Sequence, residues 1–257
     1  MKVCFYFGRV TQFQTLPWQR LLFHIMLHFD IITLFPSAFS YFDESIIKRA
    51  KEKELVKIKF HNLRDFTKDK HKKVDDRPYG GGAGMVLMAE PIISAVESAV
   101  KPFQKKGVKS KVIIFSAKGK PFNQKLARQW SKNFSHIVLV SGRYEGIDER
   151  AKKILKAEEV SIGPYVLTDG DIASMVVVSA VSRLIPGTIK FESLQEESHW
   201  DKVLKDEQKV DDEKTLEYPH YTRPEILEYK GKKYRAPKVL LSGNHIEIDK
   251  WRKQQMK

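Results

Sequence analysis

Short apolar runs alternate with amphipathic segments along most of the chain, and this alternation restricts its fold more than any other feature. The first run, HFDIITLF at residues 28–35, is rich in β-branched and aromatic residues and stops at a proline, which predicts a strand. Further strands are predicted at 56–60, 111–116 and 136–141, and helices at 37–54, 90–100, 123–132 and 172–184. Strands that alternate with helices favour a parallel sheet covered on both faces, so we predict an α/β fold.

Both ends of the chain and one internal segment depart from this pattern. Residues 1–25 scatter charges among aromatics without a helical or strand period and precede a second methionine, Met26. We interpret them as an N-terminal extension that need not be native, with Met26 as an alternative start. Residues 190–214 are acidic and poor in apolar groups, which is typical of an interdomain linker. A small second unit, 215–257, follows and ends in a helix predicted at 244–253.

The charge balance indicates a polyanionic partner. Lys and Arg number 46 against 32 Asp and Glu, a net charge of +14, and such an excess favours phosphate-rich ligands. The excess is concentrated in residues 48–73, with eleven bases and four acids, and in 101–132, with ten bases and no acid. Charge alone leaves a solvated basic surface as the alternative interpretation.

Cysteine, histidine and hydropathy patterns indicate a cytoplasmic protein without a metal site. Cys4 is the single cysteine, which excludes an internal disulfide and a cysteine zinc cluster, and the eight histidines show no metal-ligand spacing. No segment reaches the roughly 20 apolar residues of a membrane span. The first 25 residues lack the apolar core and cleavage site of a signal peptide.

Three glycine-containing segments are candidates for ligand binding. In 75–85, four glycines occupy five positions and permit close backbone approach, although the segment matches neither a P-loop nor a dinucleotide fingerprint. The segments 141–150 and 161–171 each lie at or just after a predicted strand, where open α/β sheets bind ligands. Ile162, Tyr165 and Leu167 supply apolar walls for a flat base. Taken singly, each segment is better explained as an ordinary connecting loop.

Seven motifs occur in a fixed order: HFDIITLFP, DRPYGGGAGMVLM, SGRYEGIDER, SIGPYVL, AVSRLIPG, EYPHYTRP and LLSGNHIEIDKWR. Together they resemble the bacterial tRNA (guanine-N1)-methyltransferase family of the trefoil-knot, or SPOUT, class, over residues 27–252. The resemblance implies a knotted parallel-sheet domain at 26–189, with a deep trefoil knot, and a small, mostly helical C-terminal tRNA-binding domain at 215–257. It also implies a homodimer with shared active sites. The reaction implied is methyl transfer from S-adenosylmethionine, which is consumed, to N1 of guanosine 37 of tRNA.

The resemblance also assigns the site residues. It places the methyl donor against a set drawn from three segments: Ile114, Phe115, Ser116, Gly142, Tyr144, Glu145, Gly146, Ile162, Gly163, Pro164, Tyr165, Val166, Leu167 and Gly170. Arg183 of AVSRLIPG stabilises charge on guanine O6, and Glu197 is assigned as the general base by matching Ser198 to the family's serine; an ungapped alignment places Ser198 there instead. The tRNA contacts are Arg77, Arg143, His220, Tyr221 and Arg223, and no metal is assigned.

The chain departs from the family pattern at the donor loop. Pro164 stands where the family usually has Asp, and Asp169-Gly170-Asp171 stands where it usually has Gly-Gly-Glu. The sequence also stops five residues after Arg252, before the longer helical tail of relatives. Three alternatives remain open: a knotted methyltransferase acting on another RNA atom, a noncatalytic RNA-binding relative, and a nucleotide-dependent oxidoreductase.

Overall fold

The computed structural model describes residues 26–190 and 218–255. Its centre is a five-stranded sheet in the order β2-β1-β6-β5-β7, in which every neighbouring pair is parallel. The strands are β1 (Leu27–Thr33), β2 (Val56–Asn62), β5 (Ser110–Pro121), β6 (His136–Val140) and β7 (Glu158–Ser161). The predicted parallel α/β sheet is therefore confirmed. The extension at 1–25 and the linker at 190–214, apart from Lys190, lie outside the described residues.

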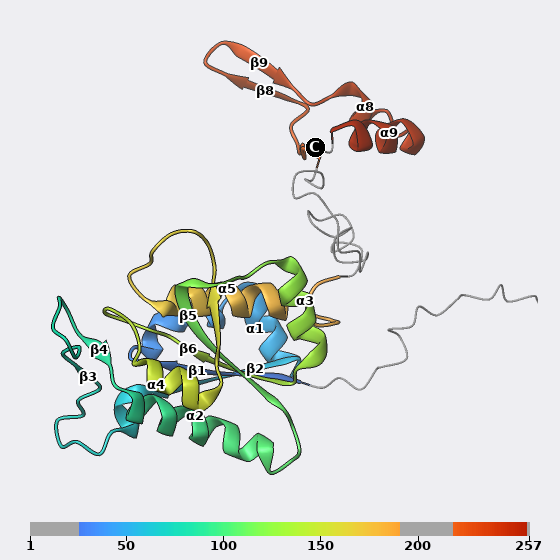
Figure 1. The fold of residues 1–257 in the computed structure, drawn as a ribbon. Coiled ribbons are helices and arrows are strands. Elements are labelled where there is room, and N and C mark those ends of the chain that lie inside the picture. Colours follow the sequence, from blue (N-terminus) through green and yellow to red (C-terminus); the bar gives the residue numbers. More distant parts are fainter. Residues whose placement is uncertain (1–25, 191–217, 256–257) are drawn as a thin grey trace, which may run out of the picture.

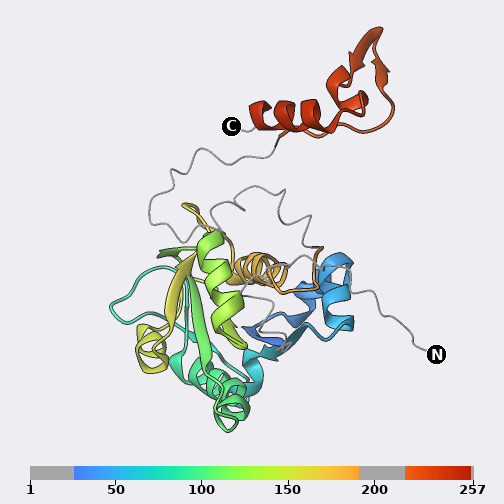
Figure 2. The ribbon, with the colours of Figure 1, turned by 90° about the vertical axis from the view of Figure 1, so that its right-hand side faces the viewer.

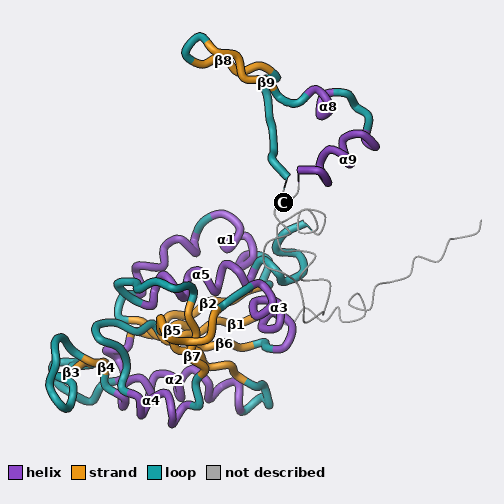
Figure 3. Tube along the Cα trace, turned by 45° about the horizontal axis from the view of Figure 1, so that its top comes forward, coloured by secondary structure: helices purple, strands orange, loops and turns teal. Residues whose placement is uncertain are grey.

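Helices cover both faces of the sheet, as Figures 1 and 3 show. One face packs against α1 (Ser45–Glu52), α3 (Gln124–Asn133) and α5 (Gly170–Ser182), which contribute to one apolar cluster. The opposite face packs against α2 (Ala89–Gln104) and α4 (Glu149–Leu155), which contribute to a second cluster. Since both faces are buried, the central strand β6 is apolar along its whole length after His136, as expected for parallel strands.

The helix predicted at 37–54 is interrupted. Residues Pro36–Asp43 form the 3-10 helix η2, and α1 starts only at Ser45, whose φ is +51°. Phe39 and Phe42 are both buried in η2. A spacing of three residues matches the 3-10 repeat, so this geometry directs both rings into the core, where each lies close to Phe60.

The remaining elements are short and lie outside the central sheet. A second 3-10 helix, η3 (Leu63–Phe66), follows β2, and β3 (Asp75–Asp76) pairs antiparallel with β4 (Val86–Leu87). The C-terminal unit contains the hairpin β8 (Ile226–Tyr229) and β9 (Lys232–Arg235), then α8 (Lys238–Leu241) and α9 (His245–Gln255), as Figure 2 shows. The helix predicted at 244–253 corresponds to α9. The sequence did not predict the hairpin.

A buried polar network joins four strands within the apolar core. The Nε2 atoms of His61 and His136 donate to the two carboxylate oxygens of Asp30, at 2.6 and 2.7 Å. Nδ1 of His136 lies 2.6 Å from Oγ of Ser110, and the ring of Phe103 stacks on His136. Burial would raise the pKa of Asp30, but the hydrogen bonds from the two histidines outweigh it and hold this pKa at about 2.

This low pKa predicts a specific dependence of stability on pH. A carboxyl group whose pKa is lowered by folding stabilises the protein above its unfolded value of about 4, and this contribution is lost as the pH falls towards 2. Asp30→Asn is therefore expected to reduce the free energy of unfolding at pH 7 by about 2 kcal/mol, with a smaller difference from wild type at pH 3. Urea unfolding of the wild type and the variant at pH 7 and at pH 3 measures these free energies. Asp65→Asn, at an exposed ion pair, is the control, and equal losses for Asp30→Asn at both pH values would contradict the prediction.

Candidate functional site

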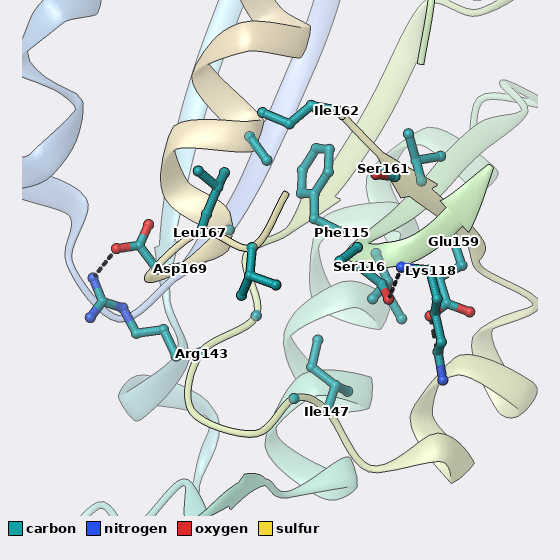
Figure 4. Close-up of a pocket in the computed structure, with 18 of the residues that line it drawn as sticks. Phe115, Ser116, Lys118, Arg143, Ile147, Glu159, Ser161, Ile162, Leu167 and Asp169 are labelled. Atoms are coloured by element: carbon teal, nitrogen blue, oxygen red, sulfur yellow. Dashed lines mark hydrogen bonds and ion pairs between the residues drawn. The ribbon is translucent and has the colours of Figure 1, made fainter. Parts of the chain in front are cut away.

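A cavity of about 460 Å³ opens at the carboxyl ends of β5, β6 and β7. Its walls are formed by the ends of these neighbouring strands and by the loops that follow them, as Figure 4 shows. The lining segments are 114–118, 142–147, 159–163 and 165–170, together with Glu149, Lys152 and Ala173. The structure thus brings residues from 114–118, 142–152 and 159–173 to one edge of the sheet.

The residues assigned to the donor by sequence all line this cavity, except Pro164. Pro164 is exposed and is not part of the cavity wall. Phe115, Ile147, Ile162 and Leu167 form an apolar middle section, and polar side chains occupy both ends, as Figure 4 shows. This combination of apolar walls and a few polar groups is typical of a small-molecule site.

One polar end is built around Arg143. Its Nη2 donates to Oδ2 of Asp169 at 3.1 Å and to Oδ2 of Asp171 at 3.3 Å, and its guanidinium lies 4.3 Å from the centre of the Phe35 ring. Asp171 is almost fully buried and also accepts a hydrogen bond from Thr33. Arg143, which the resemblance assigned to tRNA, lies in the cavity wall between these two carboxylates.

The other polar end contains Lys118, Lys152, Glu149 and Glu159. Nζ of Lys152 lies 2.5 Å from Glu159 and 3.2 Å from Glu149, and Nζ of Lys118 lies 3.9 Å from Glu159. Burial would raise the pKa of Glu159, but hydrogen bonds from Lys152 and Ser116 lower it overall. Sequence reasoning missed this cluster. Lys118, Lys152 and Glu159 belong to none of the seven motifs, and Glu149, although part of SGRYEGIDER, was given no role there.

Close backbone contact fixes the shape of the cavity. The N–H of Gly170 donates to the carbonyl of Gly142 at 2.8 Å, which joins the start of α5 to the loop after β6. A Cβ on Gly170 would lie 2.7 Å from the nitrogen of Gly142 and 2.9 Å from Cα of Ser141. These are backbone atoms that a rotamer change cannot move, so this position requires glycine.

The glycine-rich segment lies beside the cavity, although it does not line it. It forms the loop between β3 and β4, and Gly80, Gly81, Gly82 and Gly84 all have positive φ. The N–H of Glu145, a cavity residue, donates to the carbonyl of Met85 at 3.0 Å. Tyr79, at the tip of this loop, is 97% exposed. The loop therefore presents an exposed aromatic ring and Arg77 near the cavity.

Arg183 is half-buried at the C-terminal end of α5 and does not line the cavity. Gly170, at the first turn of α5, does line it. Thirteen helical positions separate the two, which at about 1.5 Å per residue places Arg183 roughly 20 Å from the cavity end of the helix. Within one chain, the structure does not bring Arg183 and the cavity together. Glu197 and Ser198 lie outside the described residues.

The C-terminal unit carries the other residues assigned to tRNA. His220 packs against Tyr218, and Tyr221 lies near Trp251 of α9. On the hairpin, Leu227 pairs with Tyr234 and Tyr229 with Lys232, so these four share one face. Leu227, Tyr229 and Tyr234 are each more than half exposed, and Nζ of Lys230 lies 5.3 Å from the Tyr229 ring centre.

The described residues contain neither a metal site nor a membrane-spanning helix. Among residues 26–190 and 218–255, no group of three or more His, Cys, Asp or Glu side chains is arranged to hold a metal ion. Over the same ranges, none of the helices has the length and apolar character needed to cross a membrane.

Comparison with known proteins gives a consistent match. The sequence profile of a family described as "tRNA (Guanine-1)-methyltransferase TrmD" matches residues 27–257. A protein of Thermomicrobium roseum named tRNA (guanine-N(1)-)-methyltransferase is 49% identical over 88% of this chain and 78% of its own length. Proteins of the same name from Carboxydothermus hydrogenoformans and Dictyoglomus turgidum are 48% and 49% identical, over 88% and 90% of this chain and 81% and 85% of their own.

Proposed function

The chain belongs to the tRNA (guanine-1)-methyltransferase family and methylates N1 of a guanine in tRNA, and we propose that its target is guanosine 37, with S-adenosylmethionine as the donor. The observation that supports this most is the clustering of the assigned donor residues. Apart from Pro164, all of them line one cavity at the carboxyl edge of a parallel sheet. That edge is where open α/β sheets bind nucleotides.

The cavity suits this donor in size and chemistry. Its volume of about 460 Å³ lies in the range of pockets that enclose ligands of this size. Phe115, Ile162 and Leu167 offer apolar surfaces to a flat base, and the glycine-containing loops expose backbone groups for hydrogen bonds. When bound, the donor supplies an electrophilic methyl group on a positively charged sulfur.

Two side chains are proposed to act on the guanine. The N1–H proton must leave as the new N1–CH3 bond forms, and the Glu197 carboxylate is the proposed acceptor. Negative charge develops on O6 at the same time, and Arg183 is proposed to stabilise it. Guanine N1 lies on the Watson–Crick edge, so the target base has to be unpaired or flipped out of a stack.

The position of Arg183 supports a homodimer with shared active sites. At about 20 Å from the cavity end of α5, Arg183 cannot reach a methyl group held in the cavity of its own chain. Ile172 and Val176 are 47% and 41% exposed on the same helix, which leaves an apolar stripe for a second copy to cover. A symmetric pair would bring Arg183 of one protomer to the cavity of the other.

The domain assignments complete this proposal. We place the SPOUT methyltransferase domain at 26–189, with the deep trefoil knot among the loops that line the cavity. The linker at 190–214 carries Glu197, and 1–25 precede the domain. The unit at 215–257 is the proposed tRNA-binding domain, and a cytoplasmic location fits a tRNA-modifying enzyme.

Basic and aromatic side chains support the proposed tRNA contacts. Lys230, Lys232, Lys233 and Arg235 lie on or beside the hairpin, whose exposed tyrosines can stack on unpaired bases while the cations bind phosphates. His220, Tyr221 and Arg223 precede this hairpin. Arg77 and Tyr79 offer a comparable pair on the loop beside the cavity.

Labelled S-adenosylmethionine and two tRNA transcripts, with guanosine or adenosine at position 37, test the proposal. Methyl incorporation is expected in the guanosine transcript alone, and equal incorporation in both would show that another atom or position is modified. In the same assay Glu197→Gln is expected to lower turnover by about 10²- to 10⁴-fold. Loss of turnover in Ser198→Ala but not in Glu197→Gln would overturn the assignment of the base.

A further inference from the structure

The two polar ends of the cavity differ in net charge. At the Arg143 end, one guanidinium is shared by the carboxylates of Asp169 and Asp171, which leaves a formal charge of −1. At the opposite end, Lys118 and Lys152 face Glu149 and Glu159, so the charges balance. Glu145 adds another carboxylate to the wall, from the loop that contains Arg143. Figure 4 shows the Arg143–Asp169 pair and the Lys118–Glu159 pair on opposite sides of the apolar residues.

The negative end is shielded from solvent and held in place. The side chains of Asp169 and Asp171 are only 13% and 4% exposed, and Arg143 is fixed by both of them and by the Phe35 ring. Charges that are removed from water act more strongly on a neighbouring ion than exposed charges do. Asp171 also accepts a hydrogen bond from Thr33 and does not line the cavity. Asp169 is the carboxylate of this pair that lines it.

We propose that Asp169 determines the preference of the cavity for the charged donor over its uncharged product. This inference rests on the proposed donor, whose positive sulfur becomes neutral when the S–CH3 electron pair returns to it and S-adenosylhomocysteine forms. The sulfonium faces the Arg143 end, where the uncompensated carboxylate charge attracts it. The adenosine part, which carries no charge, faces the balanced end. Loss of this attraction after methyl transfer weakens product binding and aids release.

Asp169→Asn is a suitable test because it removes the charge with little change of shape. The Asp169 side chain caps α5 by accepting from the N–H of Asp171 at 2.9 Å, and asparagine caps helices equally well. Isothermal titration calorimetry with S-adenosylmethionine and S-adenosylhomocysteine measures both affinities. In the variant, the donor is expected to bind about fivefold to tenfold more weakly, and the product to change less than about twofold.

Glu159→Gln is the matched control, since it removes one carboxylate from the balanced end of the same cavity. Its effects on the two ligands are expected to be similar, so their affinity ratio stays at the wild-type value. An unchanged ratio in Asp169→Asn, or a ratio that changes as much in Glu159→Gln, would overturn the inference. Wild-type protein that binds neither ligand would instead refute the proposed donor itself.

A wild-type measurement tests the same inference without a mutation. A donor analogue with a protonated amine in place of the sulfonium retains the positive charge but has no methyl group to transfer. It should bind more tightly than S-adenosylhomocysteine, and the difference should shrink with added salt because the charges are screened. Equal affinities for the charged analogue and the neutral product would contradict the proposed role of Asp169.

Discussion

Replacing Arg183 with alanine is expected to lower the turnover of tRNA methylation by about 10²- to 10³-fold, the effect of removing one preorganised donor to a developing oxyanion. The affinity for S-adenosylmethionine should stay at its wild-type value, because Arg183 does not line the cavity. Single-turnover kinetics measure the first quantity and calorimetry the second. A parallel loss of donor affinity would show that Arg183 supports the fold of the cavity and not the chemistry.

Gly170→Ala is expected to weaken donor binding by at least about 100-fold, because the added Cβ would lie 2.7 Å from a backbone nitrogen of Gly142. The start of α5 and the loop after β6 would have to separate, and the hydrogen bond between Gly170 and Gly142 would be lost. Calorimetry measures the affinity. Circular dichroism at increasing temperature reports whether the variant still folds.

Gly142→Ala is the matched control for Gly170→Ala within the same cavity. A Cβ on Gly142 first meets Cδ1 of Ile147 at 3.6 Å, which is an ordinary contact with a side chain that can adjust. This variant should retain measurable donor binding. Similar losses in both variants would show that any added methyl group blocks the cavity, and that backbone separation is not the cause.

The Arg183→Ala and Gly170→Ala variants together test whether the active site is shared between protomers. In a mixed dimer, the Arg183→Ala chain supplies an intact cavity and the Gly170→Ala chain supplies an intact Arg183. One working site per mixed dimer is expected, so a mixture of the two variants should be more active than either variant alone. No recovery, in dimers shown to have exchanged subunits, would place the whole site within one chain.

The sequence predicted the central strands of the sheet because each of them coincides with a short run of β-branched and apolar residues. The runs that contain β1, β2 and β6 are rich in β-branched and apolar residues. The strand predicted at 111–116 continues in the structure to Pro121, because β5 pairs with β7 twice, with a register shift between Phe115 and Lys120. A Cβ on Gly119 would lie 2.5 Å from the nitrogen of Val160. This second pairing depends on contact with a distant strand, which no local pattern reveals.

The sequence predicted those parts of the candidate site that lie in recognisable motifs. It did not predict the ion pairs at the two ends of the cavity. The segments at 141–150 and 161–171 were assigned from glycines and from the resemblance, and the structure places both around one cavity. The ion pairs of Arg143 with Asp169 and of Lys152 with Glu159 were not predicted. Charged residues are frequent in this chain, so spacing alone does not single out the few that are buried together.

The sequence by itself determined the alternation of strands and helices, the net positive charge and the family, because each follows from composition, local residue patterns or ordered motifs. Tertiary structure alone decided which charges meet. Asp30 contacts His136 across 106 positions, and Arg143 contacts Asp169 across 26, because parallel strands from distant parts of the chain lie side by side. It also placed Arg183 at the far end of α5 from the cavity. Distances between elements depend on packing, which a one-dimensional pattern does not encode.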